Sequence, residues 1–299
     1  YGQLSDKFWD KYVFSGTIPS VISRYCLLVA DKMDFRHEVI NSSLKPVITP
    51  VDDFKLYTWQ LNDAPVLKEE PLMPKIADIG QTLHISSVKD WKVIADWYSD
   101  LVTKAMEEEF EVREVYNQLF PAGKAYTDSA KAAIIYDYIE SNISYSSVSF
   151  RQGAFIPQRP SATINAKLGD CKDVSALFVA LARMAGLKAN MVLVDTRNNG
   201  SRDMIFPSVE FNHCIVKVML GKKEQYLELT DNNLPMGAFP TNLHHALSLL
   251  IPNKGETLAE YALAPIPVSG KKKDIMRSDI ILRTEGNQIK VKTTITRYG

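Results

Sequence analysis

The stretch Gly169–Gly186 reads GDCKDVSALFVALARMAG, a polar start followed by an almost wholly apolar continuation. A helix that is apolar on nearly every side belongs in the interior of a domain, where other elements surround it. Gly186 follows the last apolar residues, at the position where a left-handed residue commonly ends a helix. Cys171 lies in the first turn, where unpaired amide N–H groups and the helix dipole favour a thiolate. The stretch therefore predicts a buried helix that begins with a candidate nucleophile.

A cysteine nucleophile needs a base that can stand beside the thiolate as an imidazolium ion. His213 is the candidate, because it lies on a strand predicted for residues 212–220. In the next predicted strand, residues 225–230, alternation places Glu228 on a face from which it could reach a paired histidine. Asp231, just beyond that strand, is the rival for this role. A helix cysteine or a strand histidine alone is more often a packing residue, so the hypothesis depends on the order of the three groups.

Four short segments carry a resemblance to a known family. They are GDCKD at 169–173, RMAG at 183–186, FNHCI at 211–215 and YLELTD at 226–231. Together they resemble the transglutaminase-like superfamily, whose members have papain-like folds and a Cys-His-Asp triad in this chain order. The resemblance is closest to a bacterial group with a β-sandwich domain before the core and a further β domain after it.

The resemblance implies a role for each matching residue. Cys171 takes the position of the nucleophile and His213 that of the base. The family usually has Leu-Asp-Pro-Thr at the third position, whereas this chain has Leu-Glu-Leu-Thr at 227–230, so Glu228 replaces the aspartate. We predict that Glu228 orients His213, with Asp231 as the alternative, because it matches a second acidic residue common in the group. The longer side chain also leaves open a catalytically weak or inactive binding or scaffold module.

An oxyanion hole is expected to use the backbone N–H of Cys171 and one donor from upstream in the chain. Papain-like enzymes often have a glutamine six residues before the cysteine, and Asn165 occupies that position here. Gln158, in the preceding loop, is the other candidate. The loops at 145–162 and 195–207 are expected to form the walls of the cleft.

The function that these expectations favour is thiol-dependent cleavage of an amide through a thioester. Attack by water would make the protein a peptidase or amidase, and attack by an amine would make it a transglutaminase. The expected substrate is a protein, a peptide or a peptidoglycan-like amide. A third hypothesis, redox sensing by Cys171, is weakened because Cys214 should face away from His213. Cys214 and Cys26 are both expected in the core.

Composition excludes several classes of protein. The chain has 299 residues, 45% of them hydrophobic, and its 35 basic residues balance its 35 acidic ones, which argues against a nucleic-acid partner. No apolar run approaches the ~20 residues of a transmembrane helix, and three cysteines are too few for a disulfide framework. No cofactor and no metal site are expected. Relatives in the bacterial group are typically exported, so a periplasmic or cell-surface location is expected, and a start at Tyr1 is compatible with a removed signal peptide.

Residues 1–88 are predicted to be the C-terminal part of a β-sandwich domain. Apolar runs at 14–19, 25–30 and 54–61 indicate strands, and frequent prolines indicate turns between them. The segment YTWQ at 57–60 also resembles this domain of the family.

Residues 89–252 are predicted to form the transglutaminase-like core, with helical periodicity at 87–115 and 128–143. Either Ser87 or Asp90 could cap the first of these helices. Residues 253–299 are predicted to begin a further β domain. The expected fold class is α+β, a buried cysteine-bearing helix on an antiparallel sheet, flanked by β-rich domains.

Overall fold

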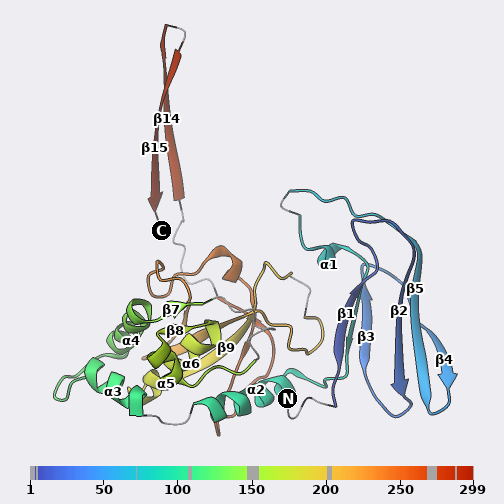
Figure 1. Ribbon diagram of the computed structural model, residues 1–299, viewed down its shortest axis with the longest axis horizontal. Coiled ribbons are helices and arrows are strands. Elements are labelled where there is room, and N and C mark those ends of the chain that lie inside the picture. The colour runs from blue at the N-terminus through green and yellow to red at the C-terminus, as the bar shows by residue number, and fades with distance from the viewer. Residues whose placement is uncertain are drawn as a thin grey trace. The chain divides into compact units, whose positions relative to one another are not determined.

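The computed structural model describes residues 4, 6–71, 73–106, 110–146, 155–200, 204–267, 275–286 and 288–298. The chain forms two compact units, Tyr1–Ile266 and Pro267–Gly299 (Figure 1). Among the described helices, none combines the length and the apolar character that a membrane crossing requires.

The first unit begins with two three-stranded antiparallel sheets, separated in sequence from the helices that follow (Figure 1). One sheet has the order β1 (Trp9–Val13), β6 (Thr82–Ser86), β3 (Arg36–Ile40), and the other β2 (Ser20–Ala30), β5 (Phe54–Ala64), β4 (Val47–Val51). The short helix α1 (Ile76–Ile79) precedes β6. Side chains from both sheets share one buried cluster around Trp59, which is 0% exposed. The β-rich character expected for this part is confirmed.

Two details of this region differ from the prediction. Residues 14–19 are a connection between β1 and β2, not a strand, because the apolar run contains Gly16 and Pro19. Cys26 is exposed rather than in the core. It alternates with Tyr25 along β2 and therefore lies on the outer face of its sheet, which an apolar run alone does not reveal.

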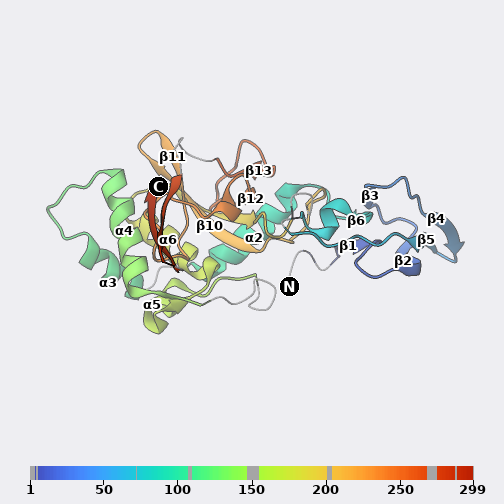
Figure 2. The same ribbon diagram turned by 90° about the horizontal axis from the view of Figure 1, so that it is seen from above.

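The helices of the core gather around α6 (Cys171–Met184), which α4 and α5 contact (Figure 2). The predicted helix at 87–115 is in fact two helices, α2 (Trp91–Ala105) and α3 (Phe110–Leu119). Asp90 caps α2 by accepting a hydrogen bond from the Val93 N–H at 3.2 Å. The other helices are α4 (Asp128–Asn142) and α5 (Pro160–Ala166).

An antiparallel sheet supports α6. Its order is β11 (Lys223–Leu227), β10 (His213–Leu220), β9 (Ala189–Asp195), β12 (Leu247–Leu250), β13 (Ala264–Pro265). The 3₁₀ helix η2 (Thr241–Leu243) leads into β12. A separate parallel pair, β7 (Ser144–Tyr145) and β8 (Leu168–Gly169), ends directly before α6.

The prediction of a buried helix at the centre of the core is confirmed. Leu177, Phe178 and Leu181 are each 0% exposed, and burial of such side chains contributes about 1.5–3 kcal/mol apiece. Gly186 has φ +76°, the left-handed conformation expected after the helix. The Leu187 N–H donates to the Ala182 carbonyl at 2.9 Å and closes the C-terminal turn.

The second unit is a two-stranded antiparallel hairpin of β14 (Ile275–Glu285) and β15 (Gln288–Tyr298). Both strands lie within residues 253–299, the part of the chain expected to be β. Large apolar side chains on both strands are exposed, among them Ile280 at 60% and Val291 at 60%.

Candidate active site

Cys171 is the first residue of α6, and its side chain is 5% exposed. Asp170 caps the helix, accepting hydrogen bonds from the N–H groups of Lys172 at 3.0 Å and Asp173 at 3.2 Å. The Asp173 carboxylate in turn accepts from the Asp170 N–H at 3.0 Å, which completes a capping box. The two carboxylates therefore fix the backbone on both sides of the thiol.

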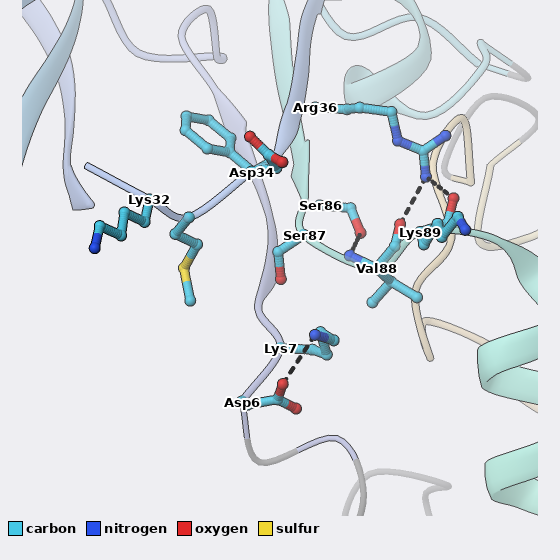
Figure 3. A pocket seen from close by; sticks show the side chains of 11 residues that line it. Asp6, Lys7, Lys32, Asp34, Arg36, Ser86, Ser87, Val88 and Lys89 are labelled. Carbon is cyan, nitrogen blue, oxygen red and sulfur yellow. Dashed lines mark hydrogen bonds and ion pairs between the residues drawn. The ribbon is translucent and has the colours of Figure 1, made fainter. Parts of the chain in front are cut away.

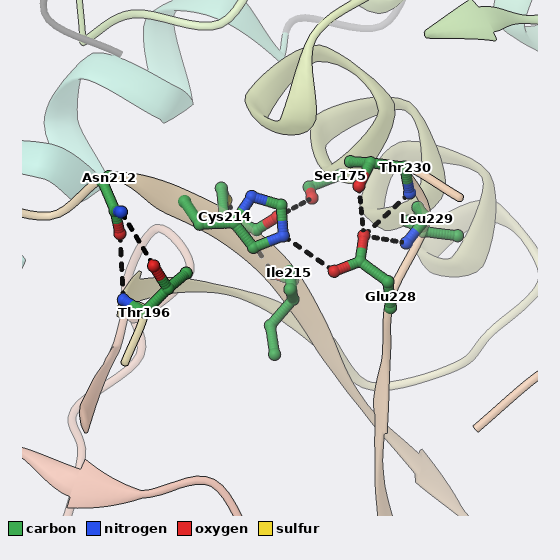
Figure 4. A network of polar contacts seen from close by, with 9 residues as sticks. Ser175, Thr196, Asn212, Cys214, Ile215, Glu228, Leu229 and Thr230 are labelled. Carbon is green, nitrogen blue, oxygen red and sulfur yellow. Dashed lines mark hydrogen bonds and ion pairs between the residues drawn. The ribbon is translucent and has the colours of Figure 1, made fainter. Parts of the chain in front are cut away.

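His213 begins β10 and forms a hydrogen bond with Glu228. Its Nε2 lies 2.7 Å from Oε2 of Glu228, and the two side chains are 13% and 2% exposed (Figure 4). With Nε2 used in this contact, Nδ1 is the nitrogen left for Cys171, which is one of the neighbours that raise the pKa of the imidazole. The structure thus pairs His213 with Glu228 and places Cys171 near enough to influence the charge of the imidazole.

The strand that leads to Glu228 ends earlier than predicted. Strand β11 stops at Leu227, which pairs with Val216, so Glu228 lies just beyond the ladder rather than within it. Outside the ladder its carboxylate folds back on the chain. Its Oε1 accepts hydrogen bonds from the Leu229 N–H at 2.9 Å, the Thr230 N–H at 2.8 Å and the Thr230 hydroxyl at 2.7 Å. These bonds accommodate the additional methylene and direct Oε2 at His213.

The electrostatics of this pair favour both charged forms. Burial alone would lower the pKa of His213, but the charge of Glu228 and hydrogen bonds to Cys171 and Glu228 raise it to about 10. Burial alone would raise the pKa of Glu228, but the charge and hydrogen bond of His213 and the bonds from Thr230 lower it. The site therefore holds a protonated imidazole at neutral pH.

The side-chain amide of Asn212 fixes the backbone just before His213, and the sequence analysis did not predict this contact. Asn212 Oδ1 accepts from the Thr196 N–H at 2.9 Å, and its Nδ2 donates to the Thr196 hydroxyl at 2.8 Å (Figure 4). These bonds join the start of β10 to the end of β9. The only signal in the sequence is an asparagine directly before the histidine, which by itself does not identify a partner 16 residues away.

Asp231 takes part in a local turn. It is exposed, and its Oδ1 accepts from the N–H of Asn233 at 3.0 Å in a local turn. Two hydrogen bonds join the loop that follows Asp231 to α4. Asn232 donates to the Glu140 carbonyl at 2.8 Å, and Tyr136 donates to the Leu234 carbonyl at 2.9 Å. The geometry therefore favours Glu228 over Asp231 as the partner of His213.

The two candidate oxyanion residues lie in different surroundings. Asn165 is exposed at the end of α5, and its amide contacts Glu111 of α3 at 3.4 Å. Gln158 precedes α5 in the chain but packs beside the first turn of α6. Its N–H donates to Asp173 Oδ1 at 2.7 Å, and its side-chain amide donates to Oδ2 at 3.0 Å. Gln158 is therefore beside the turn that carries Cys171, whereas Asn165 faces another helix.

Cys214 is buried at 1% exposure, as expected for a core residue. It lies on the face of the sheet that packs against α6, where Ser175 donates to its carbonyl at 3.4 Å (Figure 4). Burial raises the pKa of the Cys214 thiol well above its ordinary value, and the nearby Cys171 raises it further. Cys214 is thus held as a neutral thiol.

Two cavities of the first unit lie away from Cys171, His213 and Glu228. One, of about 630 Å³, is lined by residues such as Lys32, Arg36 and Ser87, with Arg36 donating to the Val88 carbonyl at 2.7 Å (Figure 3). Another, of about 810 Å³, includes Arg197 and Thr241. Cys171, His213 and Glu228 line neither. Parts of the two loops expected to wall the cleft, 147–154 and 201–203, lie outside the described residues.

No group of three or more His, Cys, Asp or Glu side chains suited to a metal ion occurs in the described part of the chain. The arrangement is instead suited to a thiol nucleophile whose proton is held by an imidazole.

Comparison with known proteins gives a family and a fold. Residues 113–229 match the profile of the transglutaminase-like superfamily. No curated protein matches the chain in sequence. A solved candidate protease from Parabacteroides distasonis superimposes with a TM-score of 0.66 at 15% identity, over 88% of this chain and 48% of its own, so this chain spans about half of that protein. A candidate cysteine protease from Cytophaga hutchinsonii aligns over 75% of this chain and 74% of its own at 13% identity, with a TM-score of only 0.32.

Proposed function

Because residues 113–229 belong to the transglutaminase-like superfamily, we propose that the chain is a thiol enzyme that cleaves amide bonds through a Cys171–His213–Glu228 triad. The observation that carries the proposal is the 2.7 Å contact between His213 and Glu228, beside a cysteine at a helix N-terminus. A thiol, an imidazole and a carboxylate in series are what an acyl-transfer enzyme needs.

In the proposed reaction, Cys171 Sγ attacks the carbonyl carbon of an amide and forms a tetrahedral intermediate. The His213 imidazolium then gives its proton to the amide nitrogen, the C–N bond breaks, and the amine leaves a thioester on Cys171. His213, now neutral, takes a proton from the second nucleophile as that nucleophile attacks the thioester. The C–S bond breaks, and the thiolate–imidazolium pair is restored.

Glu228 contributes by holding one tautomer and one orientation of the imidazole. Its Oε2 accepts the Nε2 proton, which keeps Nδ1 on the side of Cys171, and its own position is fixed by three bonds to Oε1. The backbone N–H of Cys171 is the first proposed oxyanion donor, and the amide of Gln158 is the second, once it leaves Asp173.

The substrate proposed is a protein or peptide amide, and hydrolysis is the favoured outcome. The likeness to a candidate protease supports a protease-like fold. One argument for the competing hypothesis of an inactive scaffold is the glutamate at the third position. Since the Glu228 carboxylate reaches His213 at 2.7 Å, the longer side chain gives no reason to expect a broken triad.

The proposal is tested by assaying the wild-type chain, Cys171→Ala and His213→Ala on a quenched-fluorescent peptide library and on casein. A parallel assay offers a glutamine-containing peptide with a fluorescent primary amine and measures both amine incorporation and ammonia release. Activity in the wild type that both variants lose supports the triad, and the assay that responds identifies the acceptor. Equal turnover by the wild type and Cys171→Ala would contradict the proposal.

A further inference from the structure

Lys172 is a buried cation next to the proposed nucleophile. Its side chain is 1% exposed, and it is among the largest fully buried side chains of the described chain. Its ammonium group contacts Oδ2 of Asp170, whose side chain is 6% exposed. Burial of two ions costs several kcal/mol each unless they are paired, so such a pair in the first turn of α6 requires a reason.

The two acidic residues of this turn are satisfied in different ways. The Asp173 carboxylate accepts hydrogen bonds from uncharged groups, namely the N–H of Asp170 and the N–H and side-chain amide of Gln158. Asp170 accepts two backbone N–H groups on Oδ1, while its Oδ2 meets the Lys172 ammonium. Lys172 therefore neutralises the carboxylate that immediately precedes Cys171.

The charge around Cys171 shows why this matters. Besides the groups of α6 itself, Tyr98 of α2 and both His213 and Cys214 of β10 interact with the charges of this turn, and Glu228 after β11 pairs with His213. When the thiolate forms, negative charge lies on Cys171 and on the carboxylates of Asp170, Asp173 and Glu228, and the charges of His213 and Lys172 oppose it. Loss of Lys172 would leave the charge of the Asp170 carboxylate uncompensated on the residue next to Cys171, and a nearby like charge disfavours the thiolate.

We propose that Lys172 is a positioning residue whose buried ammonium group cancels the charge of Asp170 and thereby allows Cys171 to ionise. The inference rests on the nucleophilic role proposed for Cys171. Lys172 acts through the charge of the helix N-terminus and takes no part in bond making or breaking.

The test measures the rate of alkylation of Cys171 by iodoacetamide as a function of pH, by peptide mass spectrometry on the full chain. The variants are Lys172→Met, Asp170→Asn and the double variant. Asparagine keeps the capping oxygen, so it removes charge without removing the cap. Lys188→Met, at an exposed lysine beyond the far end of the same helix, is the matched control, and exposed Cys26 is the internal reference.

Both single variants break the same ion pair, yet the proposal expects opposite effects. Lys172→Met should move the midpoint of the alkylation profile upward by about one to two pH units. Asp170→Asn should move it downward, the double variant should return close to wild type, and Lys188→Met should not change it. Shifts of both single variants in the same direction, or no shift in folded Lys172→Met, would overturn the proposal.

Two further outcomes are covered by the same set. If Lys172→Met does not fold, Asp170→Asn is compared with the double variant, which should have the higher midpoint; equal midpoints would overturn the proposal. If the shifts appear but no amide substrate is turned over, the proposed function fails while the role of Lys172 stands.

Discussion

The imidazole of His213 donates its Nε2 proton to Glu228, whose carboxylate lies 2.7 Å away and is almost fully buried. The contact joins the first residue of β10 to a residue just past the end of β11, two strands that pair with each other. Because β11 ends at Leu227, Glu228 is free of the ladder and its side chain can turn back on residues 229 and 230. The position of a strand end thus determines which acidic residue reaches the histidine.

Substitution of Glu228 should impair catalysis more than substitution of Asp231. Glu228→Gln removes the charge that raises the pKa of His213, so the alkaline limb of the activity profile should move to lower pH. The maximal rate should fall by a factor on the order of 10²–10⁴, the usual contribution of acid–base catalysis. Steady-state kinetics from pH 5 to 10 on a cleaved peptide measure both effects.

Asp231→Asn is the matched control, because Asp231 is exposed and accepts its hydrogen bond from Asn233 in a local turn. It should retain the wild-type profile. A large loss in Asp231→Asn together with a small one in Glu228→Gln would show that the histidine uses the other carboxylate during turnover.

The three cysteines should differ in their reaction with an alkylating reagent. Cys26 is exposed and should label readily in the folded chain. Cys214 is 1% exposed and the pKa of its thiol is raised by burial, so it should label only after unfolding. Cys171 should label in the folded chain at a pH where Cys26 is still slow, because His213 holds its proton.

His213→Ala is the control for this comparison and should remove the early reaction of Cys171 without affecting Cys26. The rates are read separately by peptide mass spectrometry. Early labelling of Cys171 that persists in His213→Ala would mean that the helix terminus alone sustains the thiolate.

The parts of this site that could be predicted from sequence are those with local causes. Helix α6 has a capping box at its start, an apolar body and a left-handed glycine at its end, and each signal lies within a few residues of the feature it specifies. The roles of Cys171, His213 and Glu228 are likewise predicted from short motifs, through their order along the chain and the family that they resemble.

The parts that could not be predicted depend on distant contacts. The Asn212–Thr196 bonds connect two strands across 16 residues, and nothing in either residue identifies the other. Apolar residues recur at helical spacing through 87–115, so the sequence predicts one helix there. The structure has two, α2 and α3, because periodicity alone does not show where one helix ends and the next begins. Cys26 was expected in the core because an apolar run was read without its alternation, and one residue of register decides which face a strand residue occupies.

The stability of the chain should depend on pH through the His213–Glu228 pair. The pKa of folded His213 is about 10 against an ordinary 6.5, so its contribution is fully present below pH 6.5 and is lost as the pH rises toward 10. The pKa of Glu228 is lowered from 4.5, so its contribution is present above pH 4.5 and is lost as the pH falls through the lower, folded value.

Thermal melts at pH 6, 8 and 9.5 measure the alkaline effect. The wild type should lose more stability over this range than His213→Ala, which has no imidazole to deprotonate. Measurements stay below pH 10 because burial raises the pKa of Tyr98 and Tyr136 above their ordinary value of 10, and they would add their own dependence there. Parallel curves for the two proteins would show that His213 is not charged in the folded state.

Two glycines at opposite ends of α6 should respond differently to alanine. A Cβ at Gly169 would lie 3.0 Å from Asp173 Cβ and 3.1 Å from Thr163 Cγ2, so α5 and the first turn of α6 must separate. Gly169→Ala should therefore cost about 1–3 kcal/mol of unfolding free energy and also reduce activity, because the displaced turn carries Cys171.

At Gly186 a Cβ would meet no atom within 4 Å, but the φ of +76° is unfavourable for alanine, and the cost should be about 1–2 kcal/mol. Denaturant unfolding and active-site titration of the folded fraction separate the two effects. Gly186→Ala should keep full activity per folded molecule, and full activity of folded Gly169→Ala would mean that the catalytic turn tolerates the crowding at Gly169.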